Sequence, residues 1–145
     1  MALHLIKLCV GCDSVDDLKG WIRERLRDKK VRGLPREHVH TTRMAPKRCD
    51  ELLAGGSLFW VIRGELICRQ RLKDLRVVRG RDGIQRCELV LAPTVILVQP
   101  RAWRPFQGWR YLPHADAPTD LDRAARGAKA MPEPLRRELR ELGLL

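Results

Sequence analysis

The sequence has few aromatic residues and no long apolar run. Phe, Trp and Tyr together make up 5% of the 145 residues. No stretch approaches the roughly 20 apolar residues that a membrane-spanning helix needs. His4 and Lys7 interrupt the apolar N-terminal stretch, which also has no basic start, so it does not fit a secretory signal peptide. We therefore expect no membrane partner and a cytoplasmic protein.

The sequence also lacks the patterns that mark a metal site or a familiar reaction. Its five cysteines are an odd and scattered set, which fits reduced thiols better than a disulfide framework. Cys9 and Cys12 form a CxxC pair, but no second pair completes a zinc site. No Gly-rich phosphate loop, nucleophile elbow or metalloprotease motif is present. We predict no metal and no cofactor, and the sequence favours a non-enzymatic role without excluding catalysis.

Positive charge is what the sequence has in excess. It contains 29 Lys and Arg against 18 Asp and Glu, which gives a formal net charge of +11 at pH 7. The excess lies within residues 15–111, because basic and acidic residues are equally numerous in 1–14 and in 112–145. A compact domain with this much positive charge repels itself, and an anionic partner relieves the repulsion. Nucleic acid is the partner class that this charge favours.

Periodicity in the sequence predicts the secondary structure. Apolar residues that alternate with polar ones predict strands, and an apolar period of 3.6 residues predicts helices. A strand is expected over 2–10, followed by a helix from Ser14, as N-cap, to about Lys30. A short helix over 46–54 ends at a Gly-Gly pair. Further strands are expected at 39–44, 57–63, 66–75, 86–91 and 94–98, and further helices at 119–130 and 133–142.

This order of elements predicts an α+β fold. We expect a single domain over residues 1–145, with a core at about 2–112 and a C-terminal helical segment at about 119–142. The strands at 57–63 and 66–73 flank a tight turn, so they are expected to be adjacent and antiparallel. The sheet is expected to be mostly antiparallel and to curl into a small β-barrel with flanking helices.

Two basic segments are candidates for binding nucleic acid. The first, at 43–48, precedes the short helix, and the second, at 101–111, holds four aromatic residues and three arginines and is kept extended by prolines. Aromatic faces stack on bases and arginines contact phosphates. The alternative is that Phe106 and Trp109 plug the end of the barrel while the arginines are solvated. The candidate binding residues are Arg43, Lys47, Arg48, Trp103, Arg104, Phe106, Trp109 and Arg110.

Five stretches of the sequence together resemble a known family. They are residues 3–11, 13–18, 42–48, 51–64 and 104–112. They resemble a bacterial family known only as domain of unknown function 1489, and the resemblance covers about residues 2–125. It implies no activity, because the family has no established one. The short helix, the Gly-Gly pair and the strand pair that follows also look like the entry of the RNA-binding and modified-base-binding PUA, ASCH and EVE barrels, which implies a PUA-like barrel by analogy.

Together these observations predict a nucleic-acid-binding module, with RNA as the expected ligand, that uses a basic surface and aromatic stacking. One alternative is an enzyme acting on a nucleotide or nucleic acid with its site around His38 and His40, which share a face of one expected strand. Another is an accessory domain that docks on a ribonucleoprotein or protein assembly. A deep pocket with a histidine and an acid would favour the enzyme, whereas an open, positive, aromatic groove would favour the binding module.

Overall fold

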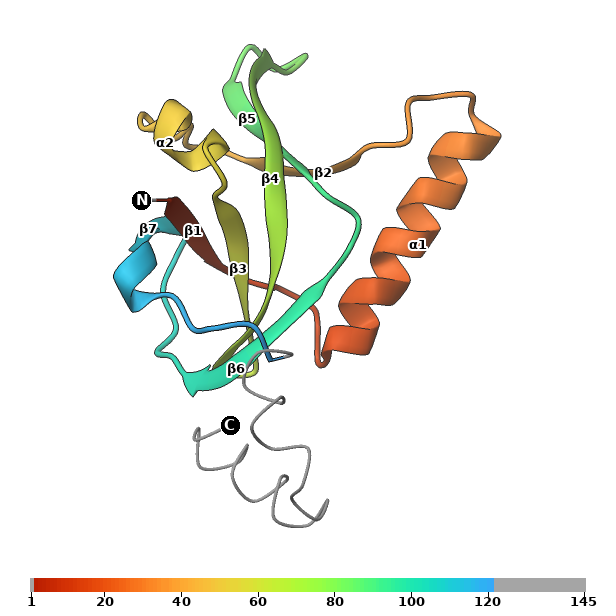
Figure 1. Ribbon diagram of the computed structural model, residues 1–145. Coiled ribbons are helices and arrows are strands. Elements are labelled where there is room, and N and C mark those ends of the chain that lie inside the picture. The colour runs from red at the N-terminus through yellow and green to blue at the C-terminus, as the bar shows by residue number, and fades with distance from the viewer. Residues whose placement is uncertain (1, 122–145) are drawn as a thin grey trace.

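A computed structural model describes residues 2–121, which form one mixed sheet with a long helix and a short helix beside it (Figure 1). The expected C-terminal helices at 119–130 and 133–142 lie outside the described residues for nearly all of their length. In chain order the elements are β1 (Leu3–Leu8), α1 (Val15–Val31), β2 (His38–Thr42), α2 (Cys49–Leu53), β3 (Ser57–Ile62), β4 (Glu65–Arg79), β5 (Gln85–Leu91), β6 (Ile96–Ala102), β7 (Trp109–Pro113) and the 3₁₀ turn η1 (His114–Asp116).

Strand β4 organises the sheet, because it pairs with three other strands. The strand order is β2-β5-β4-β3-β1-β7, and β6 also pairs with β4. All pairs are antiparallel except β1 with β3. The predicted hairpin is confirmed, since β3 and β4 pair from Ser57 opposite Arg71 to Ile62 opposite Glu65. The α+β class and the mostly antiparallel sheet are therefore as expected.

The alternation of side chains along β4 is also as expected. Leu66, Cys68, Gln70 and Leu72 are buried on one face of the strand. The opposite face carries cations, but Arg69 is not simply solvated. Its guanidinium donates two hydrogen bonds of 2.9 Å to the Asp120 carboxylate and one of 2.7 Å to Ser57 Oγ. This ion pair fixes the end of the described chain against the sheet.

Helix α1 begins where the sequence predicts. Ser14 Oγ accepts a hydrogen bond from the Asp17 backbone N–H at 3.1 Å, and Asp17 Oδ2 accepts one from the Asp13 N–H at 3.0 Å. The first bond satisfies a backbone donor that the first helical turn leaves free, and the second ties the residue before the N-cap to that turn. Leu18 and Ile22 are the fully buried residues of the helix. The sheet contact of α1 is thus concentrated in its first half.

The Gly-Gly pair after α2 is explained by a close approach of backbones. A Cβ atom on Gly56 would lie 2.2 Å from the Leu3 carbonyl oxygen and 2.3 Å from that of Leu52. Gly56 N–H donates to Leu52 O at 2.8 Å, and Leu72 N–H donates to Gly56 O at 3.0 Å. Only glycine allows the chain to leave α2 and enter β3 at this point.

The expected closed barrel does not form, because the strands at the two ends of the order, β2 and β7, do not pair. Side-chain hydrogen bonds connect these edges instead. Trp109 Nε1–H on β7 donates to Met44 O, just after β2, at 2.7 Å. Tyr111 Oη accepts from the backbone N–H groups of Lys47 at 2.9 Å and Arg48 at 3.2 Å. We call these three bonds the edge clasp.

Strand β7 itself is not among the expected strands. The segment 101–111 was expected to be extended but was not assigned to a strand, whereas residues 109–113 pair with β1 from Lys7 opposite Trp109 to Leu3 opposite Pro113. A proline is tolerated at this last position, where the strand ends. Strand β4 is likewise longer than expected, because its outer half pairs with β5 as far as Arg79 opposite Gln85.

The clasp predicts a stability difference between two tryptophan substitutions. Trp109→Phe removes the indole N–H that bonds Met44 O and is expected to destabilise the protein by about 1 kcal/mol more than Trp103→Phe. Trp103 is the matched control, since within residues 2–121 its indole N–H has no hydrogen bond. Urea unfolding measures both changes. Equal losses for the two variants would contradict the clasp.

Candidate nucleic-acid interface

The edge clasp brings the two predicted basic segments together. A groove of about 440 Å³ lies between them, and two predicted site residues, Arg43 and Trp109, line it. The clasp fixes the groove, because Trp109 bonds the backbone of Met44, which is also in the lining. No acidic residue of the described chain is among the lining residues, which are Lys7, Thr41, Thr42, Arg43, Met44, Gln107, Gly108 and Trp109.

The other two cations of the first segment lie beside the groove rather than in it. Arg48 bonds both carboxylate oxygens of Glu51, with Nε to Oε1 at 3.0 Å, and its guanidinium lies 5.6 Å from the centre of the Tyr111 ring. Its charge is therefore already paired. Lys47 is exposed and lies in a shallow hollow that also contains Asp50 and Glu51. Arg43 is thus the exposed cation of this segment that lines the groove.

The second basic segment is divided between two surfaces. Trp103 and Phe106 are half-buried and pack against a smaller core cluster that includes Phe59. The Arg110 guanidinium lies 5.1 Å from the centre of the Phe106 ring, and Arg104 is exposed. Only Trp109 of the four predicted residues in this segment reaches the groove. Trp103 and Phe106 therefore contact the core, whereas Trp109 lines the groove.

A row of side chains continues from the groove across the sheet. Lys7 lies opposite Trp109 on β7 and opposite Trp60 on β3, so the three residues occupy neighbouring positions on three adjacent strands. Adjacent strands are about 4.8 Å apart, which puts the two tryptophan backbones at about 10 Å. Lys7 lines both the groove and a second cavity that contains Trp60. We call Trp109, Lys7 and Trp60 the Trp–Lys–Trp row.

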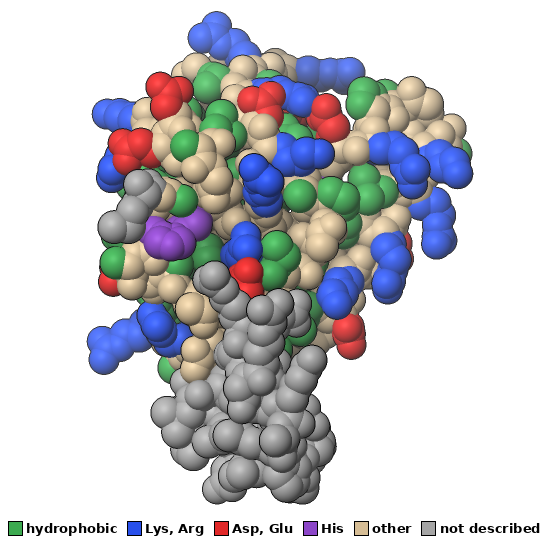
Figure 2. All heavy atoms as spheres, in the orientation of Figure 1, with side chains coloured by type: hydrophobic (Ala, Val, Ile, Leu, Met, Phe, Trp, Pro, Cys, Tyr) green, Lys and Arg blue, Asp and Glu red, His purple; other side chains and the backbone are tan. Residues whose placement is uncertain are grey.

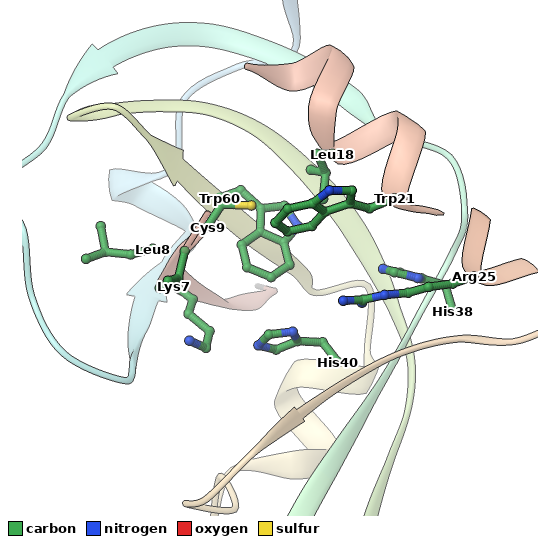
Figure 3. A pocket seen from close by; sticks show the side chains of 10 residues that line it. Lys7, Leu8, Cys9, Leu18, Trp21, Arg25, His38, His40 and Trp60 are labelled. Carbon is green, nitrogen blue, oxygen red and sulfur yellow. The ribbon is translucent and has the colours of Figure 1, made fainter. Parts of the chain in front are cut away.

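The second cavity, of about 110 Å³, lies between the first half of α1 and the sheet (Figure 3). Figure 3 shows the Trp60 ring, the Lys7 ammonium, the His40 ring and the Arg25 guanidinium pointing toward one space. His38 and Trp21 complete its polar and aromatic walls. We call it the α1 cavity, and its lining residues are Lys7, Leu8, Cys9, Val10, Leu18, Trp21, Arg25, His38, His40 and Trp60.

Trp60 forms a rigid wall of the α1 cavity. Its Nε1–H donates to Gln70 Oε1 at 2.9 Å, and Gln70 Nε2 donates to Ala92 O at 2.9 Å. The His40 ring meets it edge to face, with ring centres 5.1 Å apart. On the other side, a Cβ atom on Gly11 would lie 3.1 Å from the Trp21 ring, so this glycine lets the loop close against Trp21.

The two histidines of the α1 cavity are neutral and incompletely bonded. Burial, together with nearby cations, lowers the pKa of His38 and of His40 to about 4. His38 Nδ1 and His40 Nε2 are buried and find no hydrogen-bond partner in the described part of the chain. Such unpaired buried nitrogens are costly and call for an explanation. A polar occupant of the cavity would provide their partners.

His4, by contrast, is a buried histidine in which both ring nitrogens have hydrogen-bond partners. Its Nδ1 accepts from the Ser57 backbone N–H at 3.0 Å, so the neutral ring carries its proton on Nε2. That nitrogen lies 3.0 Å from His114 Nδ1 and donates to it. Burial lowers the pKa of His4 to about 4. His4 is therefore a structural residue that positions the start of β3.

The α1 cavity is electropositive. Burial lowers the pKa of the Lys7 ammonium, and Arg25 places its guanidinium 6.0 Å from the centre of the Trp21 ring. No carboxylate lines the cavity within the described residues. On the face drawn in Figure 2, further Lys and Arg side chains follow α1 and cap the β4–β5 hairpin. Among the described residues, neither the groove nor the cavity has an acid in its lining.

The CxxC pair lies beside this cavity. Cys9 Sγ and Cys12 Sγ are 2.7 Å apart and buried, and burial raises the pKa of both thiols. Both precede the N-cap at Ser14, so neither cysteine is in the first turn of α1. Within residues 2–121, no three His, Cys, Asp or Glu residues are placed to hold a metal ion. The prediction of no bound zinc is still to be checked by elemental analysis.

No helix in the part of the chain that the structure describes is long and apolar enough to span a membrane.

The sequence missed Lys7, Trp21, Arg25 and Trp60 as site residues. They come from three elements, and only the register of β1 with β3 and the position of α1 bring them together. The sequence does single out His38 and His40, because residues two apart on a strand share a face. The sequence indicated only that Trp60 lies in an apolar strand, not that it lines a cavity.

The buried histidines predict a loss of stability in mild acid. Their folded pKa of about 4 lies below the ordinary 6.5, so the unfolded chain binds more protons between these values. Stability is therefore complete above pH 6.5 and falls as the pH drops toward 4, by about 1–2 kcal/mol per histidine at pH 5. Urea unfolding at pH 7 and pH 5 measures the loss. His40→Phe is expected to lose less between the two pH values, and an unchanged difference would contradict the assignment of His40.

Comparison with known proteins places the chain in a family without indicating a function. No curated protein and no solved structure matches it. A family model described as "Protein of unknown function (DUF1489)" matches residues 5–145. This match covers nearly the whole chain and includes the groove, the clasp and the α1 cavity. The chain belongs to the DUF1489 family.

Proposed function

We propose that this protein binds single-stranded nucleic acid, with RNA as the expected form, in the groove between residues 41–44 and 107–109. The observation that carries the proposal is the edge clasp. It unites segments from opposite edges of the sheet into one groove lined by Lys7, Arg43 and Trp109 and by no acid of residues 2–121. Cations that follow a backbone beside an aromatic ring are the usual arrangement of single-strand binding surfaces.

The single-strand form follows from the shape of the site. The groove and the α1 cavity are concave and aromatic, and their tryptophans come from the sheet and from a helix face. Unpaired bases expose ring faces to such side chains, whereas a duplex keeps them stacked inside. A regular duplex would therefore meet only the surrounding Lys and Arg residues.

Catalysis is the weaker candidate. The α1 cavity contains His38 and His40 but no carboxylate from the part of the chain that the structure describes, and the pKa of both histidines lies well below neutrality. General acid–base catalysis works best with groups whose pKa lies near the working pH. These imidazoles are thus better suited to hydrogen bonding than to proton transfer at pH 7. The PUA-like barrel remains an analogy from the sequence, and the proposal does not depend on it.

Salt dependence tests the groove. If about five cations contact phosphates of a single strand, log K is expected to fall against log salt with a slope of about −3.5. Arg43→Ala is expected to reduce the magnitude of this slope by nearly one unit. Arg79→Ala is the matched control, because Arg79 is an exposed arginine at the far end of β4, and it is expected to leave the slope unchanged. Fluorescence anisotropy of labelled oligonucleotides at several salt concentrations measures the slope for the wild type and for both variants.

Two results would reject this function. If the folded wild type shows no salt-dependent affinity for RNA or DNA oligomers at low ionic strength, the groove is not a nucleic-acid site. An acidic protein partner, as in an accessory docking domain, would then account for the charge. If Arg43→Ala and Arg79→Ala reduce the slope equally, the attraction belongs to the whole surface and not to the groove.

A further inference from the structure

The α1 cavity has three properties that together specify an occupant. It is aromatic, with Trp21 and Trp60 in its walls. It is positive, with Lys7 and Arg25 and no acid of the described chain. It also presents two buried ring nitrogens, on His38 and His40, that lack partners within residues 2–121. An occupant must therefore have a flat face, a polar edge and a nearby negative charge.

The size of the α1 cavity limits the flat face to one ring. The cavity measures about 110 Å³. An apolar cavity of roughly 150 Å³ in another protein holds one benzene molecule. The α1 cavity is smaller than that, so no ring system larger than one six-membered ring is accommodated without movement of Trp21 or Trp60. A purine, with two fused rings, would have to leave one ring in the mouth.

The unpaired nitrogens exclude a hydrocarbon ring. A neutral imidazole offers a donor at one nitrogen and an acceptor at the other, according to its tautomer. A benzene-like occupant would leave His38 Nδ1 and His40 Nε2 unsatisfied. A pyrimidine base carries both donors and acceptors on its edge and can pair with them. The low pKa of the histidines keeps them neutral at pH 7, which suits an uncharged base.

Lys7 indicates where the negative charge of the occupant would lie. It lines both the α1 cavity and the groove and lies between Trp60 and Trp109 in the Trp–Lys–Trp row. A phosphate at Lys7 would neutralise an ammonium whose pKa burial already lowers. A strand in the groove would then pass over Lys7 with one nucleotide on either side of it, near Trp109 and near Trp60.

We propose that the α1 cavity receives one unpaired pyrimidine base, with the phosphate of its nucleotide at Lys7. This inference rests on the proposed function where the base belongs to a strand held in the groove. In this proposal the ring of the base lies against the Trp60 wall, and its polar edge provides hydrogen-bond partners for His38 Nδ1 and His40 Nε2. The cavity gives the protein a preference for base type that the groove alone cannot supply.

The first experiment compares RNA strands of about eight nucleotides, a typical single-strand site length. Oligouridylate is expected to bind at least about tenfold more tightly than an abasic strand of equal length and charge, because only it can stack a base. Oligoadenylate is expected to bind more weakly than oligouridylate. Equal affinity for uridylate and abasic strands, or tighter binding of adenylate, would overturn the proposal, whereas the salt dependence of binding and the effect of Arg43→Ala still test the phosphate contacts of the groove.

Matched variants separate the cavity from the groove. His40→Phe keeps a ring against Trp60 but removes the unpaired nitrogen, and it is expected to reduce the affinity for oligouridylate about 3–10-fold without changing that for the abasic strand. Arg43→Ala is expected to weaken both strands by the same factor. A His40→Phe variant that keeps the full preference for oligouridylate would contradict the assigned role.

Free uridine 5′-monophosphate tests the α1 cavity independently of any strand. The chain has four tryptophans, whose indole N–H signals can be followed in a ¹H–¹⁵N spectrum of the wild type. Saturable shifts at Trp21 and Trp60, with Trp103 unaffected, are expected even if no oligonucleotide binds. Ribose 5-phosphate, which lacks the base, is expected to leave Trp21 and Trp60 unshifted. Absence of shifts at these two residues with both the mononucleotide and oligouridylate would overturn the proposal.

Discussion

The position of β1 between β3 and β7 is the constraint on which the candidate site depends. Its parallel register with β3 and antiparallel register with β7 place Lys7 between Trp60 and Trp109. Side chains at these three positions share one face of the sheet, because paired residues of adjacent strands point the same way. A shift of one residue in either pairing would turn Lys7 to the other face of the sheet. The groove and the α1 cavity therefore exist only for this register.

The edge clasp complements that register by joining the ends of the open sheet. An open sheet leaves unpaired backbone groups along its two edges, and proteins usually cover or protect them. Here side chains of β7 bond the backbone that follows β2, through Met44 O and the N–H groups of Lys47 and Arg48. The same bonds hold Arg43 beside Trp109. The hydrogen bonds that connect the β2 and β7 edges of the sheet therefore also form the groove.

Local patterns in the sequence were sufficient for the elements whose signals are local. The N-cap residue Ser14, the tight turn between residues 57–63 and 66–73 and the apolar–polar alternation of these strands predicted α1 and the β3–β4 hairpin correctly. Strand β7 was missed because Pro105 and Gly108, which precede it, are typical of loops. Its pairing also depends on the edge of β1, which lies far away in the sequence. The candidate aromatic segment was treated as one surface, although strand alternation sends Trp109 and Arg110 to opposite faces. The α1 cavity depends on registers that no single-sequence pattern contains.

The groove and the α1 cavity share one electrostatic feature, which is positive charge without a neighbouring carboxylate among the described lining residues. A half-buried ammonium without a carboxylate partner is unfavourable, and so are buried imidazole nitrogens without hydrogen bonds. Within residues 2–121, the α1 cavity contains both an ammonium without a carboxylate beside it, on Lys7, and imidazole nitrogens without partners, on His38 and His40. Lys7 also lines the groove, which likewise has no carboxylate among its described lining residues. Structural stability alone would favour apolar residues or an acid at these positions. This combination supports the proposal that an anionic, hydrogen-bonding ligand completes the site, because such a ligand would satisfy the charge and the nitrogens together.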